Sequence, residues 1–250
     1  MGVIEQDVVA EGERLLERTR SEGVALRLLG GVAIGLRASG ELAPAFRRAY
    51  GDLDVVTAKK DAGAVATVLR ADGYEPHIAF NALHGGDRLL FFDNANDRQV
   101  DVFVGAFSMC HRIPLDGRLE IDPVSIPLAE LLLTKLQIVQ LNEKDVRDGL
   151  ALLHDHAIGE QDGDTVNAGR VAGLCAGDWG LWRTITQNLV ACRGLADTYD
   201  VPERERLDER VDALLERIEA EPKSRGWKLR ARIGDRKRWY DLPEEVAGGP

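Results

Sequence analysis

Hydrophobic and polar positions follow short local patterns in the first half of the chain. Short apolar runs, several of them rich in β-branched residues, predict strands at residues 24–29, 53–57, 88–92 and 99–104. Apolar residues at helical spacing predict helices at residues 5–20, 32–38 and 60–72. The last two strands flank a cluster of polar turn residues, which predicts that they form a β-hairpin.

After residue 127 the pattern is helical throughout. It predicts helices at residues 128–141, 144–156, 178–198 and 203–221, with a loop at residues 159–163. The change near residue 125 predicts an α/β (α+β) fold class. A domain at residues 1–125 would hold a small mixed β-sheet flanked by helices, and residues 126–250 would form a helical C-terminal domain.

Glycines and carboxylates interrupt the apolar runs of the N-terminal half at three points. Gly30 and Gly31 lie between a strand and a helix, where they allow a backbone to approach phosphate closely. Asp52 and Asp54 open a strand, and alternate residues of a strand share one face, so the two carboxylates would repel each other unless a cation lay between them. Asp101 lies inside a strand, where a carboxylate without a partner is costly to bury.

If the strands that carry these acids are neighbours, the three carboxylates converge. Three such oxygen ligands suit Mg²⁺ or Mn²⁺, which occur in pairs about 3.5–4 Å apart in two-metal phosphoryl-transfer centres. Each feature alone has an ordinary structural explanation: residues 162–164 repeat the Asp-x-Asp pattern in what we interpret as a solvated loop, and a glycine pair after a strand is usually a turn. Only the ordered combination indicates a site.

Two other phosphate-binding motifs do not fit this glycine pair. The glycines at positions 30, 31 and 35 do not have the spacing of a dinucleotide-binding fingerprint, whose acid would also end a strand rather than open one. A P-loop needs Lys and Ser or Thr after its last glycine, whereas Leu36 and Arg37 follow here.

A glycine pair before a helix, an Asp-x-Asp at the head of a strand and a third Asp within a strand together resemble the DNA polymerase β-type nucleotidyltransferase superfamily. The nearer resemblance is to bacterial abortive-infection-type nucleotidyltransferases, which include toxins of toxin–antitoxin pairs. It rests on residues 127–148, where Lys135 lies on one helix and Asp145 or Asp148 on the next is implied to orient it. The resemblance covers residues 24–156 and implies a nucleotidyltransferase fold.

The resemblance also implies a role for each site residue. The implied set is Gly30, Gly31, Asp52, Asp54, Asp101 and Lys135. The glycines would cradle a triphosphate, and the first two acids would hold both metal ions. Asp101 would bind the catalytic ion and help to deprotonate the acceptor, while Lys135 would neutralise phosphate charge. One departure is the gap of 20 residues between Gly31 and Asp52, where residues 39–44 look like an inserted loop.

The implied reaction is transfer of a nucleoside monophosphate from an NTP to an acceptor hydroxyl, with Mg²⁺ or Mn²⁺ as cofactor and pyrophosphate as the second product. The acceptor stays open among an RNA or tRNA end, a protein side chain and a small hydroxylated molecule. The alternative is a catalytically silent protein of the same fold that binds or regulates a partner, for example as one component of a toxin–antitoxin pair. A cognate antitoxin is then an expected partner.

Charge limits the choice of acceptor. The chain has 250 residues and a formal net charge of −10, which argues against a protein that coats duplex nucleic acid. However, residues 223–240 carry a formal charge of +7 with aromatic residues interleaved. This basic segment would either contact nucleic acid or nucleotide, or pack onto the acidic helix before it as a lid. A polyanionic acceptor is favoured if its basic residues Arg230, Arg232, Lys237 and Arg238 face the cleft that holds Asp52, and a small substrate if they face away.

The remaining composition indicates a cytoplasmic location and no membrane partner. The three cysteines are far apart in sequence and predict packed thiols without disulfides. The N-terminus lacks a secretory pattern, and the most apolar stretch, residues 126–141, is too short to span a bilayer. We interpret His154 and His156 as a solvated helix end, and Trp179 and Trp182 as core residues.

Overall fold

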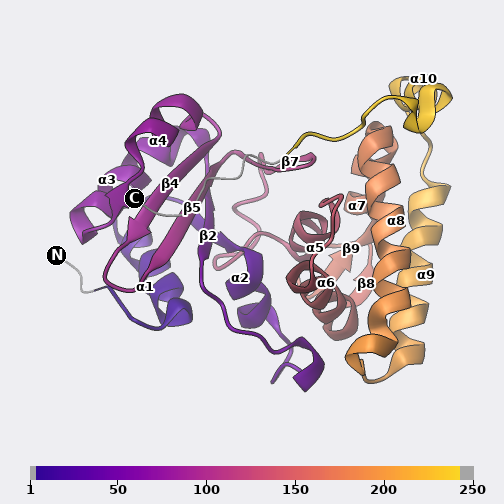
Figure 1. Cartoon of the computed structure of the whole chain (residues 1–250), viewed down its shortest axis with the longest axis horizontal. Coiled ribbons are helices and arrows are strands. Elements are labelled where there is room, and N and C mark those ends of the chain that lie inside the picture. Colours follow the sequence, from indigo (N-terminus) through magenta and orange to yellow (C-terminus); the bar gives the residue numbers. More distant parts are fainter. Residues whose placement is uncertain (1–3, 243–250) are drawn as a thin grey trace.

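A five-stranded mixed sheet forms the N-terminal half of the computed structural model, which describes residues 4–242 (Figure 1). Its strands are β1 (Leu26–Leu29), β2 (Leu53–Thr57), β3 (Glu75–Pro76), β4 (Arg88–Asp93) and β5 (Arg98–Val104), in the spatial order β1-β2-β5-β4-β3. β2 and β5 pair in parallel at the centre, and the other neighbours are antiparallel. Both central strands are apolar along most of their length because helices and loops bury them on both faces. The predicted hairpin of β4 and β5 is confirmed.

Helices cover the sheet: α1 (Val8–Ser21), α2 (Gly30–Arg37), α3 (Ala62–Asp72) and α4 (Ile78–His84). α1 begins where the Asp7 carboxylate accepts hydrogen bonds from two backbone amides of the first turn. α2 begins at Gly30 rather than after the glycine pair, so the two glycines are the first turn of the helix. The pattern missed α4, which is short and exposes Ile78 and Leu83.

The second half contains α5 (Leu128–Leu136), α6 (Glu143–Asp155), α7 (Ala168–Gly177), α8 (Trp179–Leu195), α9 (Arg204–Ala220) and α10 (Arg225–Ile233). It also holds the parallel strand pair β8 (Ala157–Gly159) and β9 (Thr165–Asn167), while the antiparallel pair β6 (Ala106–Ser108) and β7 (Arg112–Pro114) precedes α5. The prediction of a mostly helical second half is confirmed, although the pattern missed β8 and β9, which flank the predicted loop.

The helix predicted at residues 128–141 ends early, at Leu136. The side-chain amide of Asn188 on α8 donates to the carbonyls of Leu136 and Ile138 at 2.8 and 2.7 Å, and so satisfies groups that a longer helix would have paired. The side-chain oxygen of Gln137 accepts a hydrogen bond from the backbone N–H of His111. A contact between distant segments thus overrides the local pattern.

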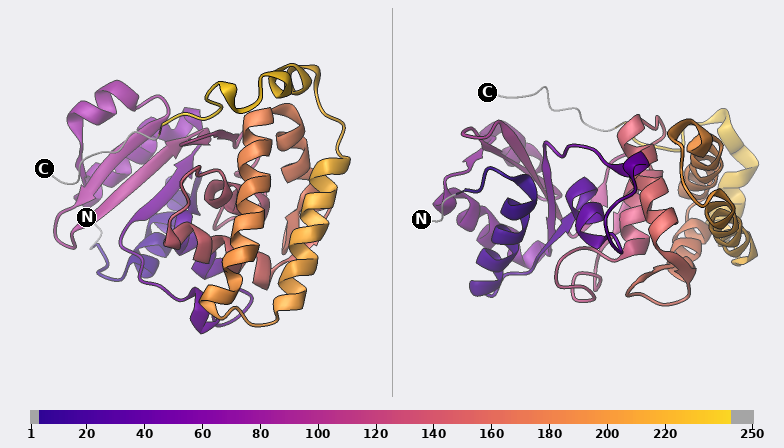
Figure 2. Two further views of the ribbon diagram at one scale, coloured as in Figure 1. Left: turned by 45° about the vertical axis from the view of Figure 1, so that its right-hand side comes forward. Right: turned by 90° about the horizontal axis from the view of Figure 1, so that it is seen from below.

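α5 is the central helix, between the sheet and the outer helices α7, α8 and α9 (Figures 1 and 2). Nearly all of its residues are buried, as expected of a helix that is apolar all round. One continuous hydrophobic cluster runs from the sheet through α5 to α9. The α/β class, with a small mixed sheet flanked by helices and helices after it, is confirmed, while the domain division near residue 125 stays a prediction.

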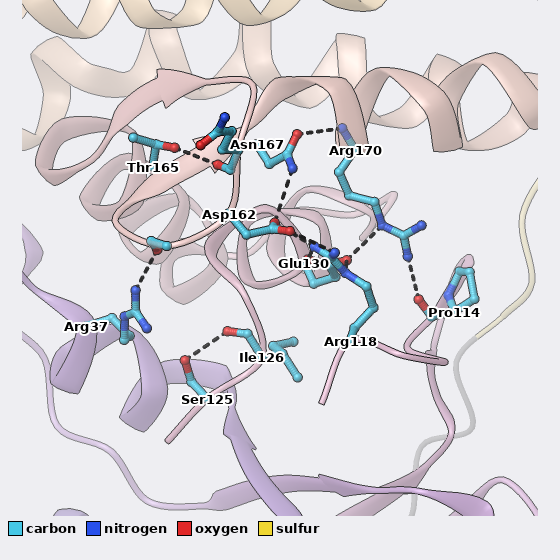
Figure 3. A network of polar contacts seen from close by, with 12 residues as sticks. Arg37, Pro114, Arg118, Ser125, Ile126, Glu130, Asp162, Thr165, Asn167 and Arg170 are labelled. Atoms are coloured by element: carbon cyan, nitrogen blue, oxygen red, sulfur yellow. Dashed lines mark hydrogen bonds and ion pairs between the residues drawn. The ribbon is translucent and has the colours of Figure 1, made fainter. Parts of the chain in front are cut away.

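A buried ion-pair network fixes α5 against its neighbours (Figure 3). Glu130 is fully buried and accepts hydrogen bonds from Arg118 and from Arg170 on α7, at 2.6 and 2.8 Å. Arg118 also bonds Asp162 in the β8–β9 loop at 2.7 Å, so that aspartate is paired rather than solvated, whereas Asp164 is exposed. The network holds in place the helix that carries Lys135.

Other expectations have mixed outcomes. All three cysteines are buried thiols, as predicted. Trp179 is buried, but Trp182 is only half-buried. His156 is buried rather than solvated, because the β8–β9 segment folds back over the end of α6. None of the helices within residues 4–242 is long and apolar enough to cross a bilayer.

Candidate functional site

Two of the three predicted acids are brought side by side by the pairing of β2 with β5. Asp54 and Asp101 are direct partners in the parallel register, so the two strands are neighbours as expected. On the other side of β2, Asp54 lies opposite Leu29, the last residue of β1. Gly30 and Gly31, which follow Leu29, therefore begin directly beside Asp54.

Gly30 allows that approach. Its φ of +70° lies in the left-handed region that favours glycine, and a side chain on it would overlap the carboxylate of Asp54. A side chain on Gly31 would instead overlap the guanidinium of Arg48 and the ring of Tyr50. The glycine pair thus makes room for an acid on one side and a cation on the other.

The residues predicted from sequence meet in a small polar cavity of about 150 Å³. It is lined by Gly31, Val32, Arg48, Tyr50, Gly51, Asp52, Asp54, Lys135, Asn142, Lys144 and Asp145. Asp52 is exposed just before β2 begins, and Asp54 is half-buried with one face open to the cavity. The cavity therefore brings together Asp52, Asp54, Gly31 and Lys135, as expected.

Lys135 lies in this cavity, where it pairs with two carboxylates of α6. Its ammonium is 2.9 Å from Asp148 Oδ2 and 3.6 Å from Asp145 Oδ1. Burial lowers the pKa of Lys135, but Asp148 and Asp145 together outweigh burial, and the net pKa lies above the ordinary value. Lys135 is therefore a fixed, charged side chain, positioned by both of the acids expected to orient it.

Arg48 is a site residue that the sequence patterns did not single out. It donates two hydrogen bonds to Asp148, at 2.8 and 2.6 Å, and its guanidinium lies over the ring of Tyr50. Burial raises the pKa of Asp148, but hydrogen bonds from Arg48 and the charge of Lys135 leave the pKa below its ordinary value. The only available signal was a pair of arginines and a tyrosine immediately before Asp52.

Asp101 is also in place, but it is already paired. It is buried, and its carboxylate accepts hydrogen bonds from Arg88 Nε and Gln99 Nε2, each at 2.8 Å. Arg88 on β4 is the partner that the sequence could not identify. Within residues 4–242 no three His, Cys, Asp or Glu side chains lie together as a ready metal site. The expected convergence of three acids is thus only partly present, because Asp101 is held by Arg88.

Asp52 and Asp54 nevertheless have the chemistry of metal ligands. No side chain of the described residues forms a hydrogen bond or ion pair with the carboxylate of Asp54, which lies beside two other acids. Burial, and after it the charge of Asp101, raises the pKa of Asp54 to about 7. The pKa of Asp52 is also raised, chiefly by desolvation in the cleft. Two such carboxylates fit Mg²⁺ or Mn²⁺, since a divalent cation would offset their repulsion.

The raised pKa of Asp54 predicts a pH dependence of stability without metal. The folded state holds the Asp54 proton more tightly than the unfolded state, because the pKa rises from 3.8 to about 7 on folding. The free energy of unfolding should therefore fall as pH rises through this window and level off above it. Relative to wild type, Asp54→Asn should gain stability across the same window in thermal melts with a chelator. Parallel pH profiles for the two proteins would contradict this prediction.

A larger cavity of about 870 Å³ adjoins the small one. The residues that line both are Asp54, Lys135, Asn142 and Asp145. The larger cavity extends from this boundary past Gly30 and the Arg88 side of the sheet to Tyr240 and Leu242 near the C-terminus. The site thus consists of two compartments that meet at Asp54 and Lys135.

The basic segment, residues 223–240, packs mainly on α8 rather than on the acidic helix before it. Trp227 stacks edge-on against Trp182, and the guanidinium of Arg230 lies 4.6 Å from the ring centre of Trp179. Only a few contacts, such as that of Lys223 with the carbonyl of Ile218, reach α9. Across the described chain, none of Arg230, Arg232, Lys237 and Arg238 lines either compartment of the site.

No family model and no curated protein sequence matches this chain. Among solved structures, the chain is similar to an antigenic nucleotidyltransferase-like protein from Paracoccidioides brasiliensis. That similarity has 12% sequence identity and a TM-score of 0.43, and covers 90% of this chain and 97% of the other. A likeness at this level carries no argument about activity, so the function has to rest on the site.

Proposed function

We propose that this protein is a metal-dependent nucleotidyltransferase, which transfers a nucleoside monophosphate from an NTP to an acceptor hydroxyl and releases pyrophosphate. The observation that carries the proposal is the position of Asp54. Its carboxylate has no side-chain partner among residues 4–242 and a pKa raised to about 7, it lies beside Asp101 in the sheet, and it touches the glycine at the first turn of α2. Asp54, Gly31 at the start of α2 and the charged Lys135 all line the small cavity.

The small cavity suits the polyphosphate. Gly31 offers the start of a helix, while Lys135, Arg48 and Lys144 bring positive charge to the same 150 Å³ space. Lys135 and Arg48 are held by Asp148, so little reorganisation is needed when phosphate binds. Lys144 has no ion pair within residues 4–242, which leaves its ammonium available to a ligand.

Asp52 and Asp54 would hold the divalent cation, which when bound neutralises charge on the transferred phosphate. Asp101, across the strand pair from Asp54, would accept the proton of the acceptor hydroxyl. Positioning and charge neutralisation then account for most of the catalysis, and no side chain has to form a covalent bond to the substrate.

The Arg88–Asp101 ion pair favours the second candidate, a catalytically silent protein that binds or regulates a partner. A guanidinium 2.8 Å from Asp101 supplies the positive charge that a metal ion would supply in an enzyme. On this alternative, a cognate antitoxin is the expected partner. The assignment to the abortive-infection type rests on the resemblance of residues 127–148.

A label-transfer experiment decides between the two functions. The protein would be incubated with each α-³²P-labelled NTP, Mg²⁺ or Mn²⁺, and pooled RNA, protein and small-molecule acceptors. We expect transfer that requires the metal and is lost in Asp52→Ala/Asp54→Ala. Absence of both transfer and metal-dependent NTP binding would exclude the enzyme, and transfer that survives in the double variant would exclude this site.

A further inference from the structure

The larger compartment has a different lining from the small one. About half of its wall is apolar or aromatic, from Phe103, Phe107, Met109, Ile138, Val139, Tyr240 and Leu242. Its polar groups include the neutral side chains of Thr134, Gln99 and Gln140. The two basic side chains that border it, Arg88 and Lys135, are paired with Asp101 and Asp148. Among residues 4–242 it therefore has no unpaired cation with which to bind a phosphate backbone.

The C-terminal strap, which we define as residues 239–242, closes one side of this compartment. Trp239 fixes the strap to α8: its indole N–H donates to Thr184 Oγ1 at 3.1 Å, and its ring meets that of Trp179 edge-on. The backbone N–H of Asp241 then donates to the carbonyl of Cys110 at 2.9 Å. Figure 1 shows this yellow segment running from α10 back toward β7. Between the two anchor points, Tyr240 lines the compartment.

We propose that the larger compartment is the acceptor site, and that its acceptor is a small organic molecule with a hydroxyl group and an apolar or aromatic body. This inference rests on the proposed function. A volume of about 870 Å³ is in the range of sites for small organic ligands. An RNA acceptor would instead need basic side chains along its path, and the four basic residues named above lie outside both compartments.

The two compartments place the reactants on opposite sides of Asp54 and Lys135. Because Asp54, Lys135, Asn142 and Asp145 line both compartments, an α-phosphate bound at this boundary would be within reach of a hydroxyl in the larger compartment. A bond forms between the hydroxyl oxygen and the α-phosphorus. The bond from that phosphorus to the oxygen bridging to the β-phosphate breaks, and pyrophosphate leaves with the electron pair. The hydroxyl proton passes to the carboxylate of Asp101, whose hydrogen-bond partners Arg88 and Gln99 line the larger compartment.

The test separates acceptor pools in parallel reactions that contain wild-type protein, α-³²P-labelled NTP and Mg²⁺. One pool is a cell extract freed of protein and RNA, and the other is purified total RNA with its tRNA. We expect label in the small-molecule pool and none in RNA. Label in RNA overturns the acceptor assignment, and so does absence of label from the small-molecule pool when metal-dependent NTP binding is intact. Loss of metal-dependent NTP binding itself would overturn the proposed function instead.

Variants of the strap test the same assignment by a second readout. Tyr240→Ala should raise about tenfold the apparent KM for the small-molecule acceptor pool, measured by transfer of label from the NTP, since it removes an aromatic wall of the site, with no change in NTP affinity. Tyr240→Phe keeps the ring and should restore most of the acceptor affinity that Tyr240→Ala loses. Leu229→Ala, on the exposed face of α10, is the matched control. A Tyr240→Ala variant with an unchanged KM, or with an equal loss of NTP affinity, would overturn the role of the strap.

Discussion

Replacement of Asp54 by asparagine is expected to abolish nucleotidyl transfer while leaving the fold intact. The amide has nearly the shape of the carboxylate, but it lacks the charge that a divalent cation requires. Removal of such an electrostatic contact should lower kcat by about 10³-fold or more. The fold should persist because the folded protein already favours the uncharged form of Asp54, whose pKa is raised to about 7. Pyrophosphate release and thermal melts together measure both effects.

Asp116→Asn is the matched control for this substitution. Asp116 is exposed in a surface turn outside both compartments, so the same chemical change should leave kcat and stability unchanged. Metal-dependent transfer by Asp54→Asn at a substantial fraction of the wild-type rate would show that Asp54 is not a metal ligand. Unfolding of the variant would contradict the inference that the neutral form suits the fold.

Replacement of Asp148 by alanine should have the largest effect on stability among substitutions in the cleft. Asp148 is buried and pairs with both Arg48 and Lys135, so its loss leaves two cations without a partner. Breaking a buried pair costs about 3–5 kcal/mol, but both cations keep some exposure to the cleft, so we expect about 2 kcal/mol. The KM for NTP should rise about tenfold at the same time, because Arg48 and Lys135 lose their orientation.

Urea unfolding and steady-state kinetics measure these two losses, and Glu143→Ala is the control. Glu143 lies on the same helix, α6, and pairs with Arg147 at the surface, where an ion pair contributes only about 0.2–1 kcal/mol. If Asp148→Ala were as stable as Glu143→Ala, the network would not support the cleft. A lower KM for NTP would show that Asp148 competes with phosphate for the two cations instead of positioning them.

The metal-ligand candidates were predictable because their signals are local. Carboxylates at the head or centre of an apolar run are unusual whatever the rest of the chain does, and this was enough to single out Asp52, Asp54 and Asp101. The glycine pair was also visible, although it forms the first turn of α2 rather than a turn before it. Why position 30 must be glycine became clear only from the β1–β2 register, which brings Gly30 into contact with the Asp54 carboxylate.

The partners of these residues were not predictable, because opposite charges pair across long stretches of chain. Arg48 and Asp148 are 100 positions apart, and nothing in their neighbourhoods marks them as a pair. In the sequence, Arg88 is an ordinary polar residue at the start of a predicted strand. The β4–β5 register places it within hydrogen-bond distance of Asp101. The early end of α5 has the same origin, since Asn188 on a distant helix bonds its last carbonyls.

The sequence by itself determined the α/β class, four of the five strands of the main sheet and the acids of the candidate site, because burial and backbone propensity leave patterns a few residues long. The tertiary structure alone decided that β2 and β5 are parallel neighbours, that Arg88 holds Asp101, and that the C-terminal strap forms one wall of the larger compartment. It also left the basic residues of segment 223–240 outside the lining of both compartments. A sequence pattern indicates which side chains are buried or charged, but the charge that each one meets depends on contacts between distant parts of the chain.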